Sequence, residues 1–149
     1  MIKTPHRVPE HRRRDRGLID TSVIIGLERI AADVLPGALA IASITLAELA
    51  AGPHATDDHA ERARRQDRLQ RAEATFDPLP FDTACARAYG HVYAHTRASG
   101  RKARGRRAID LLIAATALAS ELPLFTTNPS DFTGVETLIE VIAVTETVR

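Results

Sequence analysis

The chain has 149 residues, of which 44% are hydrophobic and 26% are charged, and its formal net charge is +1. These values are ordinary for one soluble globular domain, and the length is sufficient for a sizeable core. The single cysteine, Cys85, excludes an internal disulfide, and no apolar run approaches the roughly 20 residues of a membrane span. The basic N-terminus is not followed by the apolar stretch of a signal peptide. We therefore expect a cytoplasmic protein with no membrane partner.

The predicted elements alternate between strands and helices. The first 16 residues are polar, basic and interrupted by Pro5 and Pro9, so they are predicted to be a disordered basic arm before a single domain over residues 17–149. In chain order, we predict a strand at 17–20, a helix at 21–30, a strand at 38–43, a helix from 43 or 45 to about 52, a surface helix at 56–75, a connector or edge strand at 77–81, helices at 83–99 and 109–120, and strands at 122–127 and 137–144. This alternation is typical of a three-layer α/β/α sandwich with a mainly parallel central sheet.

Four acidic residues lie where strands meet helices, and in a parallel sheet these junctions share one edge: Asp20, Glu48, Asp110 and Asp131. Each also has a purely structural interpretation. Asp20 could cap the first helix, and Glu48 could complete a capping box with Thr45. Asp110 could stabilise the positive end of its helix, and Asp131 could begin a turn.

Considered together, the four acids favour a metal site. Two carboxylates about 4 Å apart repel each other by roughly 4 kcal/mol at an effective dielectric constant near 20. No lysine or arginine lies beside Asp20 or Glu48 in the sequence to neutralise them. Hydroxyl and amide groups are expected to surround the same edge, from Thr21, Ser22, Thr45, Thr126 and Asn128. Oxygen ligands of this kind select Mg²⁺ or Mn²⁺ rather than Zn²⁺.

The four motifs that contain these acids, LIDTS, TLAEL, IDLLIAATAL and LFTTNPSDF, resemble those of the PIN-domain ribonucleases. The similarity is greatest to the VapC branch, the toxins of bacterial toxin–antitoxin pairs, and it extends over residues 17–144. The resemblance implies a Mg²⁺- or Mn²⁺-dependent endoribonuclease that hydrolyses RNA phosphodiester bonds and is neutralised by a cognate antitoxin. It also implies a homodimer, with a higher toxin–antitoxin assembly as a further option.

The resemblance also assigns roles to individual residues. Asp20, Glu48 and Asp110 match the family's catalytic and metal-binding acids, and Asp131 matches a fourth, less constant one. Some relatives carry an acid at the position of Asn128, so the fourth ligand remains open between Asn128 and Asp131. One or two metal ions would bind the scissile phosphate and activate a water molecule.

A basic segment precedes Asp110. Residues 97–107 contain six basic side chains and no acidic one. Such a cluster is a candidate polyanion contact, although a solvated loop has the same composition. Because the segment ends only three residues before Asp110, we predict that five of its side chains contact RNA phosphates: Arg101, Lys102, Arg104, Arg106 and Arg107.

Two other functions are compatible with parts of the sequence. One is a catalytically inactive PIN-fold module that binds RNA or protein. The other is an aspartyl-phosphate phosphotransfer protein, which also begins with a strand that ends in aspartate. Ser22 stands where a phosphatase of that class carries a second acid, and the strand at 122–127 lacks the lysine of a receiver domain. Both features favour the nuclease.

Overall fold

The structure, a computed structural model, describes residues 15–147 and contains one parallel sheet in that range. The strands follow the order β2-β1-β3-β4, with bounds Arg16–Ile19 for β1, Ala38–Ala40 for β2, Leu124–Thr126 for β3 and Val141–Ala143 for β4. Most of the predicted arm, residues 1–14, lies outside the described residues. The edge position predicted for the last strand is confirmed by β4.

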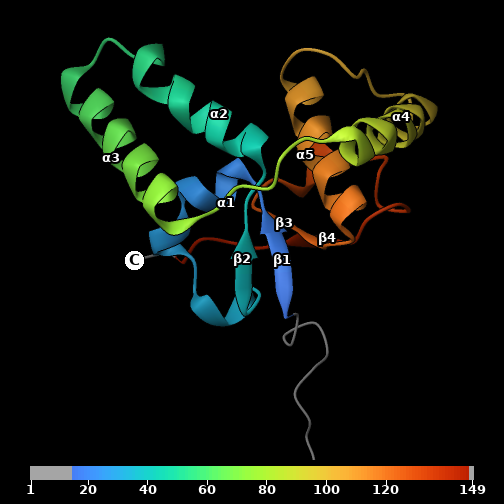
Figure 1. Cartoon of the computed structure of the whole chain (residues 1–149), viewed down its shortest axis with the longest axis horizontal. Helices are drawn as coiled ribbons and strands as arrows, with labels where there is room; N and C mark the ends of the chain where they lie inside the picture. Colours follow the sequence, from blue (N-terminus) through green and yellow to red (C-terminus); the bar gives the residue numbers. More distant parts are fainter. Residues whose placement is uncertain (1–14, 148–149) are drawn as a thin grey trace, which may run out of the picture.

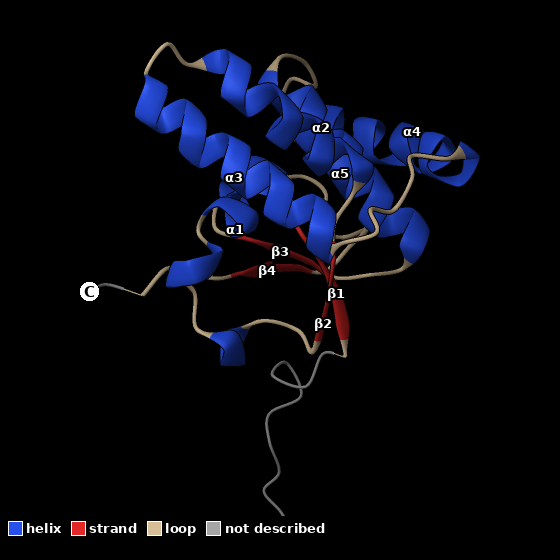
Figure 2. Cartoon of the chain, turned by 60° about the vertical axis from the view of Figure 1, so that its left-hand side comes forward, coloured by secondary structure: helices blue, strands red, loops and turns tan. Residues whose placement is uncertain are grey.

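Helices connect the strands and cover both faces of the sheet (Figures 1 and 2). The α-helices are α1 (Thr21–Ile25), α2 (Ser43–Ala51), α3 (His59–Thr75), α4 (Thr83–Ala98) and α5 (Arg106–Ser120). Short 3₁₀ turns are η2 (Leu27–Arg29), η3 (Ala32–Val34), η4 (Gly52–Ala55) and η5 (Pro129–Phe132). Both views show α2 beside α3 and α4 beside α5, so the helices form two arms above the sheet.

The two sheet faces are distinguished by alternate residues of the central strands. Leu18 and Leu124 pack with α4 and α5, whereas Ile19 and Phe125 pack with residues from α1, α2 and α3. This alternation follows from the two-residue period of a β-strand, and burial on both faces is typical of a parallel sheet. The predicted three-layer α/β/α fold is therefore confirmed.

Two glycines are required by their local structure, Gly17 by a close approach and Gly105 by its backbone conformation. A Cβ on Gly17 would lie 2.5 Å from the ring of Phe125, so a side chain there would push β1 away from β3. Gly105, with φ of +66°, turns the chain into α5. This left-handed conformation is strained for other residues, so Gly105 fixes where α5 begins.

The main differences from the predicted elements lie at their ends. The helix predicted for 21–30 is divided at Gly26 into α1 and η2, because glycine is the poorest helix former after proline. Helix α5 begins three residues earlier than predicted, so Arg106 and Arg107 are helical. Leu79 makes only an isolated parallel bridge, with Ala42, consistent with the predicted connector or edge strand.

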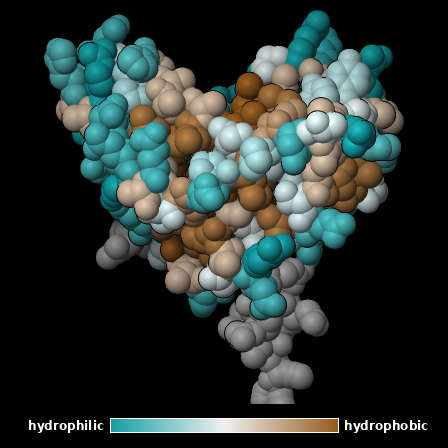
Figure 3. All heavy atoms as spheres, viewed as in Figure 1, coloured by the Kyte–Doolittle hydropathy of each residue, from teal (hydrophilic) through white to brown (hydrophobic). Residues whose placement is uncertain are grey.

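The carboxyl ends of the strands point toward the space between the two helical arms (Figure 1). In the space-filling view, a notch separates the α2–α3 arm from the α4–α5 arm (Figure 3). Asp20 follows β1 directly and is 5% exposed. The fold therefore directs the first predicted site residue to the end of the sheet that the notch overlies.

Candidate active site

The carboxylate of Asp20 is held by the residues that follow it. Ser22 Oγ donates to Asp20 Oδ1 at 2.6 Å, and the backbone N–H of Val23 donates to the same oxygen at 3.2 Å. Asp20 therefore does cap α1, as its structural interpretation required. Ser22 Oγ also accepts from the N–H of Thr127 at 3.0 Å, which ties the start of α1 to the end of β3.

Glu48 is held by a hydroxyl from another element rather than by its own helix. Thr21 Oγ1 donates to Glu48 Oε1 and is also hydrogen-bonded to Thr45 Oγ1 at 3.2 Å. Helix α2 begins after Ala42 without a side-chain cap, so the capping box considered for Thr45 and Glu48 is not formed. Glu48 instead turns toward the end of β1, where Asp20 lies.

Asp110 and Asp131 come from the opposite arm and its neighbouring turn. Asp110 is the fifth residue of α5, one turn beyond the helix start, so its first-turn interpretation does not apply. Asp131 lies in η5, where its backbone N–H donates to Asn128 O at 3.0 Å. Within residues 15–147, neither carboxylate accepts a hydrogen bond from another side chain.

The charges of the other three acids all act on Asp110. Burial, followed by the negative charges of Asp131, Glu48 and Asp20, raises the pKa of Asp110 to about 7. The positive charge of Arg106 opposes this rise. Burial also raises the pKa of Asp20, against the hydrogen bonds from Ser22 and Thr126. Acids from three other sequence motifs therefore raise the pKa of Asp110 by repelling its charge.

The donor chemistry fits a hard divalent cation, but the carboxylates are not drawn together around one. Among the described residues, no three His, Cys, Asp or Glu side chains are close enough to hold a metal ion. The donors are oxygen atoms only, which is the chemistry that Mg²⁺ and Mn²⁺ prefer.

The supporting polar residues that the sequence predicted divide into two groups. Thr126, fully buried at the end of β3, accepts from the N–H of Asn128 at 2.9 Å, and its hydroxyl lies 3.5 Å from Ser22 Oγ. Thr126 and Ser22 thus form one hydroxyl pair beside Asp20, and Thr21 and Thr45 form a second pair beside Glu48. Asn128 is exposed and is joined to the first pair through its backbone.

The predicted RNA-contacting residues do not share one environment. Lys102, Arg104 and Arg106 are exposed, and Arg101 is half-buried. Arg107 is different, because its Nη1 donates to the carbonyl oxygen of Asp131 at 2.8 Å. That contact joins α5 to η5, and no signal in the sequence indicated it.

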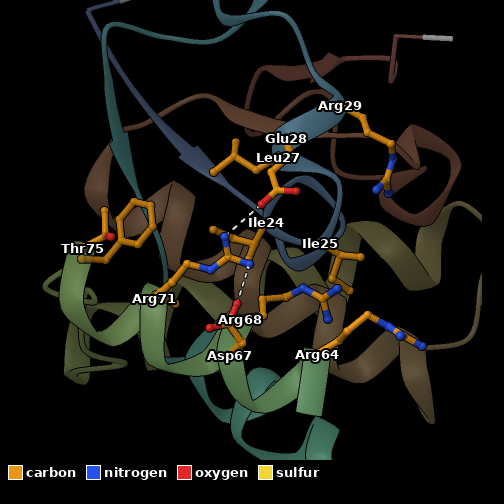
Figure 4. A pocket seen from close by; sticks show the side chains of 12 residues that line it. Ile24, Ile25, Leu27, Glu28, Arg29, Arg64, Asp67, Arg68, Arg71 and Thr75 are labelled. Atoms are coloured by element: carbon orange, nitrogen blue, oxygen red, sulfur yellow. Dashed lines mark hydrogen bonds and ion pairs between the residues drawn. The ribbon is translucent and has the colours of Figure 1, made fainter. Parts of the chain in front are cut away.

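A groove of about 370 Å³ lies apart from the acids, between α1, η2 and α3 (Figure 4). Its apolar lining includes Ile24, Leu27 and Phe76, and none of the four acids lines it. On its rim, Arg71 is paired with Glu28 at 2.9 Å and with Asp67 at 3.0 Å. The sequence did not predict this groove. The arginine-rich face of α3 lines it.

Comparison with known proteins decides the family. Residues 17–138 match the PIN domain. The chain belongs to the PIN-domain family. No curated protein matches it. The predicted VapC-type resemblance is confirmed by the solved structures to which this PIN domain is similar.

Three of these structures illustrate the similarity. VapBC-5 of Mycobacterium tuberculosis, a member of the VapBC toxin–antitoxin family, is 34% identical, with a TM-score of 0.77 over 87% of this chain and 99% of that one. FitAcB of Neisseria gonorrhoeae is 26% identical, with a TM-score of 0.66 over 84% and 95%. VapBC-1 of nontypeable Haemophilus influenzae is 26% identical, with a TM-score of 0.65 over 86% and 97%. Among the described residues of this PIN domain, no helix has the length and apolar character needed to cross a membrane.

Proposed function

We propose that this PIN domain is a Mg²⁺- or Mn²⁺-dependent endoribonuclease, the cytoplasmic toxin of a toxin–antitoxin pair. The raised pKa of Asp110 is the observation that carries the proposal. Burial and neighbouring carboxylates disfavour ionisation at a position where a divalent cation would reverse that penalty. An acid whose pKa is raised by burial and by neighbouring charges is typical of a functional site. Family membership favours hydrolysis over aspartyl-phosphate transfer.

The proposed ligands are the four acids, with Asn128 as the alternative to Asp131. Thr21 orients Glu48 through its hydroxyl, and Ser22 orients Asp20 in the same way. These bonds reduce the number of conformations that the carboxylates must give up when they bind a cation. A bound Mg²⁺ supplies Lewis-acid stabilisation of the scissile phosphate and a water of lowered pKa.

Four basic side chains at or just before the start of α5 provide the proposed route for RNA. Arg101, Lys102 and Arg104 precede the helix, and Arg106 lies one turn before Asp110. Phosphate contacts from such side chains fix the position of the strand and carry no sequence information. We therefore propose that these four residues hold the phosphates that flank the cleaved bond.

The proposed partners follow from the similar structures, whose names describe toxin–antitoxin complexes. By analogy, we propose a cognate antitoxin for this chain, and a homodimer or a higher assembly with it. Expression of the wild-type chain alone should arrest bacterial growth, whereas the Asp110→Asn variant should not. Equal toxicity of the two would argue against phosphodiester hydrolysis as the cause.

The direct test is cleavage of a mixed RNA pool by the purified chain. We expect products with Mg²⁺ or Mn²⁺, no products with EDTA, and none with the Asp110→Asn variant. Binding of Mg²⁺ without cleavage of any RNA would support the inactive binding module instead. Failure to bind any divalent ion would refute the metal-dependent proposal, and the absence of a formed ligand cluster in the described residues makes this measurement the first to perform.

A further inference from the structure

Arg107 was expected to contact RNA, but its surroundings indicate another role. Its Nη1 atom donates to the carbonyl oxygen of Asp131 at 2.8 Å, in a partly buried contact between residues 24 positions apart. The residue itself is half-buried, whereas Arg104 and Arg106 are exposed. Moving this guanidinium away from η5 to an RNA phosphate would remove the donor that the Asp131 carbonyl has in the structure.

The carbonyl that Arg107 reaches lies at the end of a short 3₁₀ turn, where backbone acceptors lack partners within the helix. The next residues do not satisfy it. Thr133 donates through both its N–H and its hydroxyl, but both bonds go to the carbonyl of Ser130, at 3.4 and 3.0 Å. The side chain of Arg107 therefore adds a polar link between η5 and α5 to the apolar packing of Phe132 in the α5 core.

Both elements that Arg107 joins carry a proposed metal ligand. Arg107 is the second residue of α5, and Asp110 follows it by three positions, which places the two on neighbouring parts of one helix face. At the other end of the contact, the bonded carbonyl belongs to Asp131 itself. One side chain thus links the backbone of Asp131 to the helix turn that presents Asp110.

We propose that Arg107 is a positioning residue that sets the separation of Asp110 and Asp131, and is not an RNA contact. This inference rests on the proposed metal-dependent function. Partners of this kind typically change metal affinity by 10- to 100-fold when removed. Mg²⁺ requires nearly ideal octahedral geometry, whereas Ca²⁺ accepts variable geometry. Loss of Arg107 should therefore weaken Mg²⁺ binding more than Ca²⁺ binding.

The test is calorimetric titration of the RNA-free full chain with Mg²⁺ alone and with Ca²⁺ alone. For Arg107→Ala we expect Mg²⁺ affinity to fall by about tenfold or more, with a smaller fall for Ca²⁺. Arg107→Lys keeps one donor for the Asp131 carbonyl, so it should recover part of the Mg²⁺ affinity and serves if the alanine variant fails to fold. Arg87→Ala, an exposed arginine on α4, is the matched control and should bind both ions as the wild type does.

A second measurement separates positioning from phosphate contact. In a salt series of RNA affinity without metal, Arg104→Ala should flatten the slope of log affinity against log salt by about 0.7, and Arg107→Ala should leave it unchanged. Unchanged Mg²⁺ affinity in Arg107→Ala and Arg107→Lys, or equal losses for Mg²⁺ and Ca²⁺, would overturn the inference alone. A wild type that binds neither ion would overturn the proposed function and this inference with it.

Discussion

Asp20 and Glu48 differ from Asp110 and Asp131 in what their carboxylates contact. The first two, the hydroxyl-bonded pair, accept hydrogen bonds from Ser22 and Thr21. The second two, the charge-coupled pair, accept none from any side chain in residues 15–147, and the charge of Asp131 helps raise the pKa of Asp110. Neutral donors therefore orient one pair of the proposed ligands, and no side-chain donor orients the carboxylates of the other pair.

The other half of the site is positioned through the backbone. Asp110 is presented by α5, and Asp131 is held through its carbonyl by Arg107. A neutral hydroxyl can fix a carboxylate without competing for the charge that a cation needs, whereas a bound arginine would neutralise it. The two pairs therefore differ in how they are held, one through side-chain hydroxyls and the other through helix and backbone contacts.

The largest expected effect is loss of RNA cleavage when any core acid is neutralised. Asp20→Asn, Glu48→Gln and Asp110→Asn should each reduce Mg²⁺-dependent cleavage by more than about a hundredfold, since even outer-shell changes cost 10- to 100-fold. The difference between the two pairs of acids also predicts different effects of these variants on stability without metal. Asp110→Asn should raise the melting temperature in EDTA because it removes repulsion, whereas Asp20→Asn should change it little because asparagine also caps helices.

Asp131 and Asn128 provide the internal control for that experiment. Asp131→Asn should cause a smaller loss of cleavage than Asp110→Asn, because Asn128 can contribute an oxygen at the same turn. If Asn128→Ala proves the more damaging change, Asn128 is the fourth ligand. Full activity in any of the three core variants, at controlled metal concentration, removes that residue from the site.

A smaller effect should follow when the hydroxyl-bonded pair loses its neutral donor. Thr21→Val keeps the shape of the side chain but removes the hydroxyl that donates to Glu48. We expect Mg²⁺ affinity to fall by about tenfold, measured by calorimetry, because Glu48 gains conformational freedom. Thr21→Ser keeps the hydroxyl and should bind Mg²⁺ nearly as the wild type does. Equal affinity in both variants would show that the hydroxyl does not orient Glu48.

The charge-coupled pair should make stability depend on pH when metal is absent. The folded state raises the pKa of Asp110 from 3.8 to about 7, so it binds this proton more tightly than the unfolded chain does. Stability from this group is therefore present at low pH and is lost as pH rises from about 4 to about 7. Urea unfolding in EDTA should show a steeper fall for the wild type than for Asp110→Asn, by up to about one proton. Identical pH profiles would show that Asp110 titrates normally.

The sequence was sufficient to predict the fold. The apolar run before Asp20 and the largely apolar segment of α5 indicated a buried strand and a buried helix. In a parallel sheet, the carboxyl ends of all strands lie at one edge. The sequence could not predict how each acid is held. The Thr21–Glu48 and Arg107–Asp131 contacts join residues 27 and 24 positions apart, and such pairs depend on tertiary packing.

Local rules also competed at several positions. Thr45 and Glu48 have the spacing of a capping box, but a hydroxyl at the start of α1 takes Glu48 instead. The basic segment seemed uniform because composition does not distinguish an exposed arginine from one that bonds a carbonyl. Helix α5 begins at Arg106, directly after Gly105 with its positive φ. Arg107 is therefore helical, and its side chain bonds a carbonyl that the sequence could not identify.

The smallest expected effect concerns the part of the basic segment that precedes α5. If Arg101, Lys102 and Arg104 contact phosphates, each releases counterions when RNA binds. Replacing all three by alanine should flatten the slope of log affinity against log salt by about two, since each contact on a single strand contributes roughly 0.7. The loss of affinity should be similar for RNAs of different sequence, because phosphate contacts do not read bases.

The Mg²⁺ affinity of the RNA-free chain should remain unchanged, which separates this variant from those that alter either pair of acids. Arg87→Ala, on α4, should leave the slope as it is in the wild type. If the triple variant also keeps the wild-type slope, the segment is only solvated, and RNA reaches the acids along another surface.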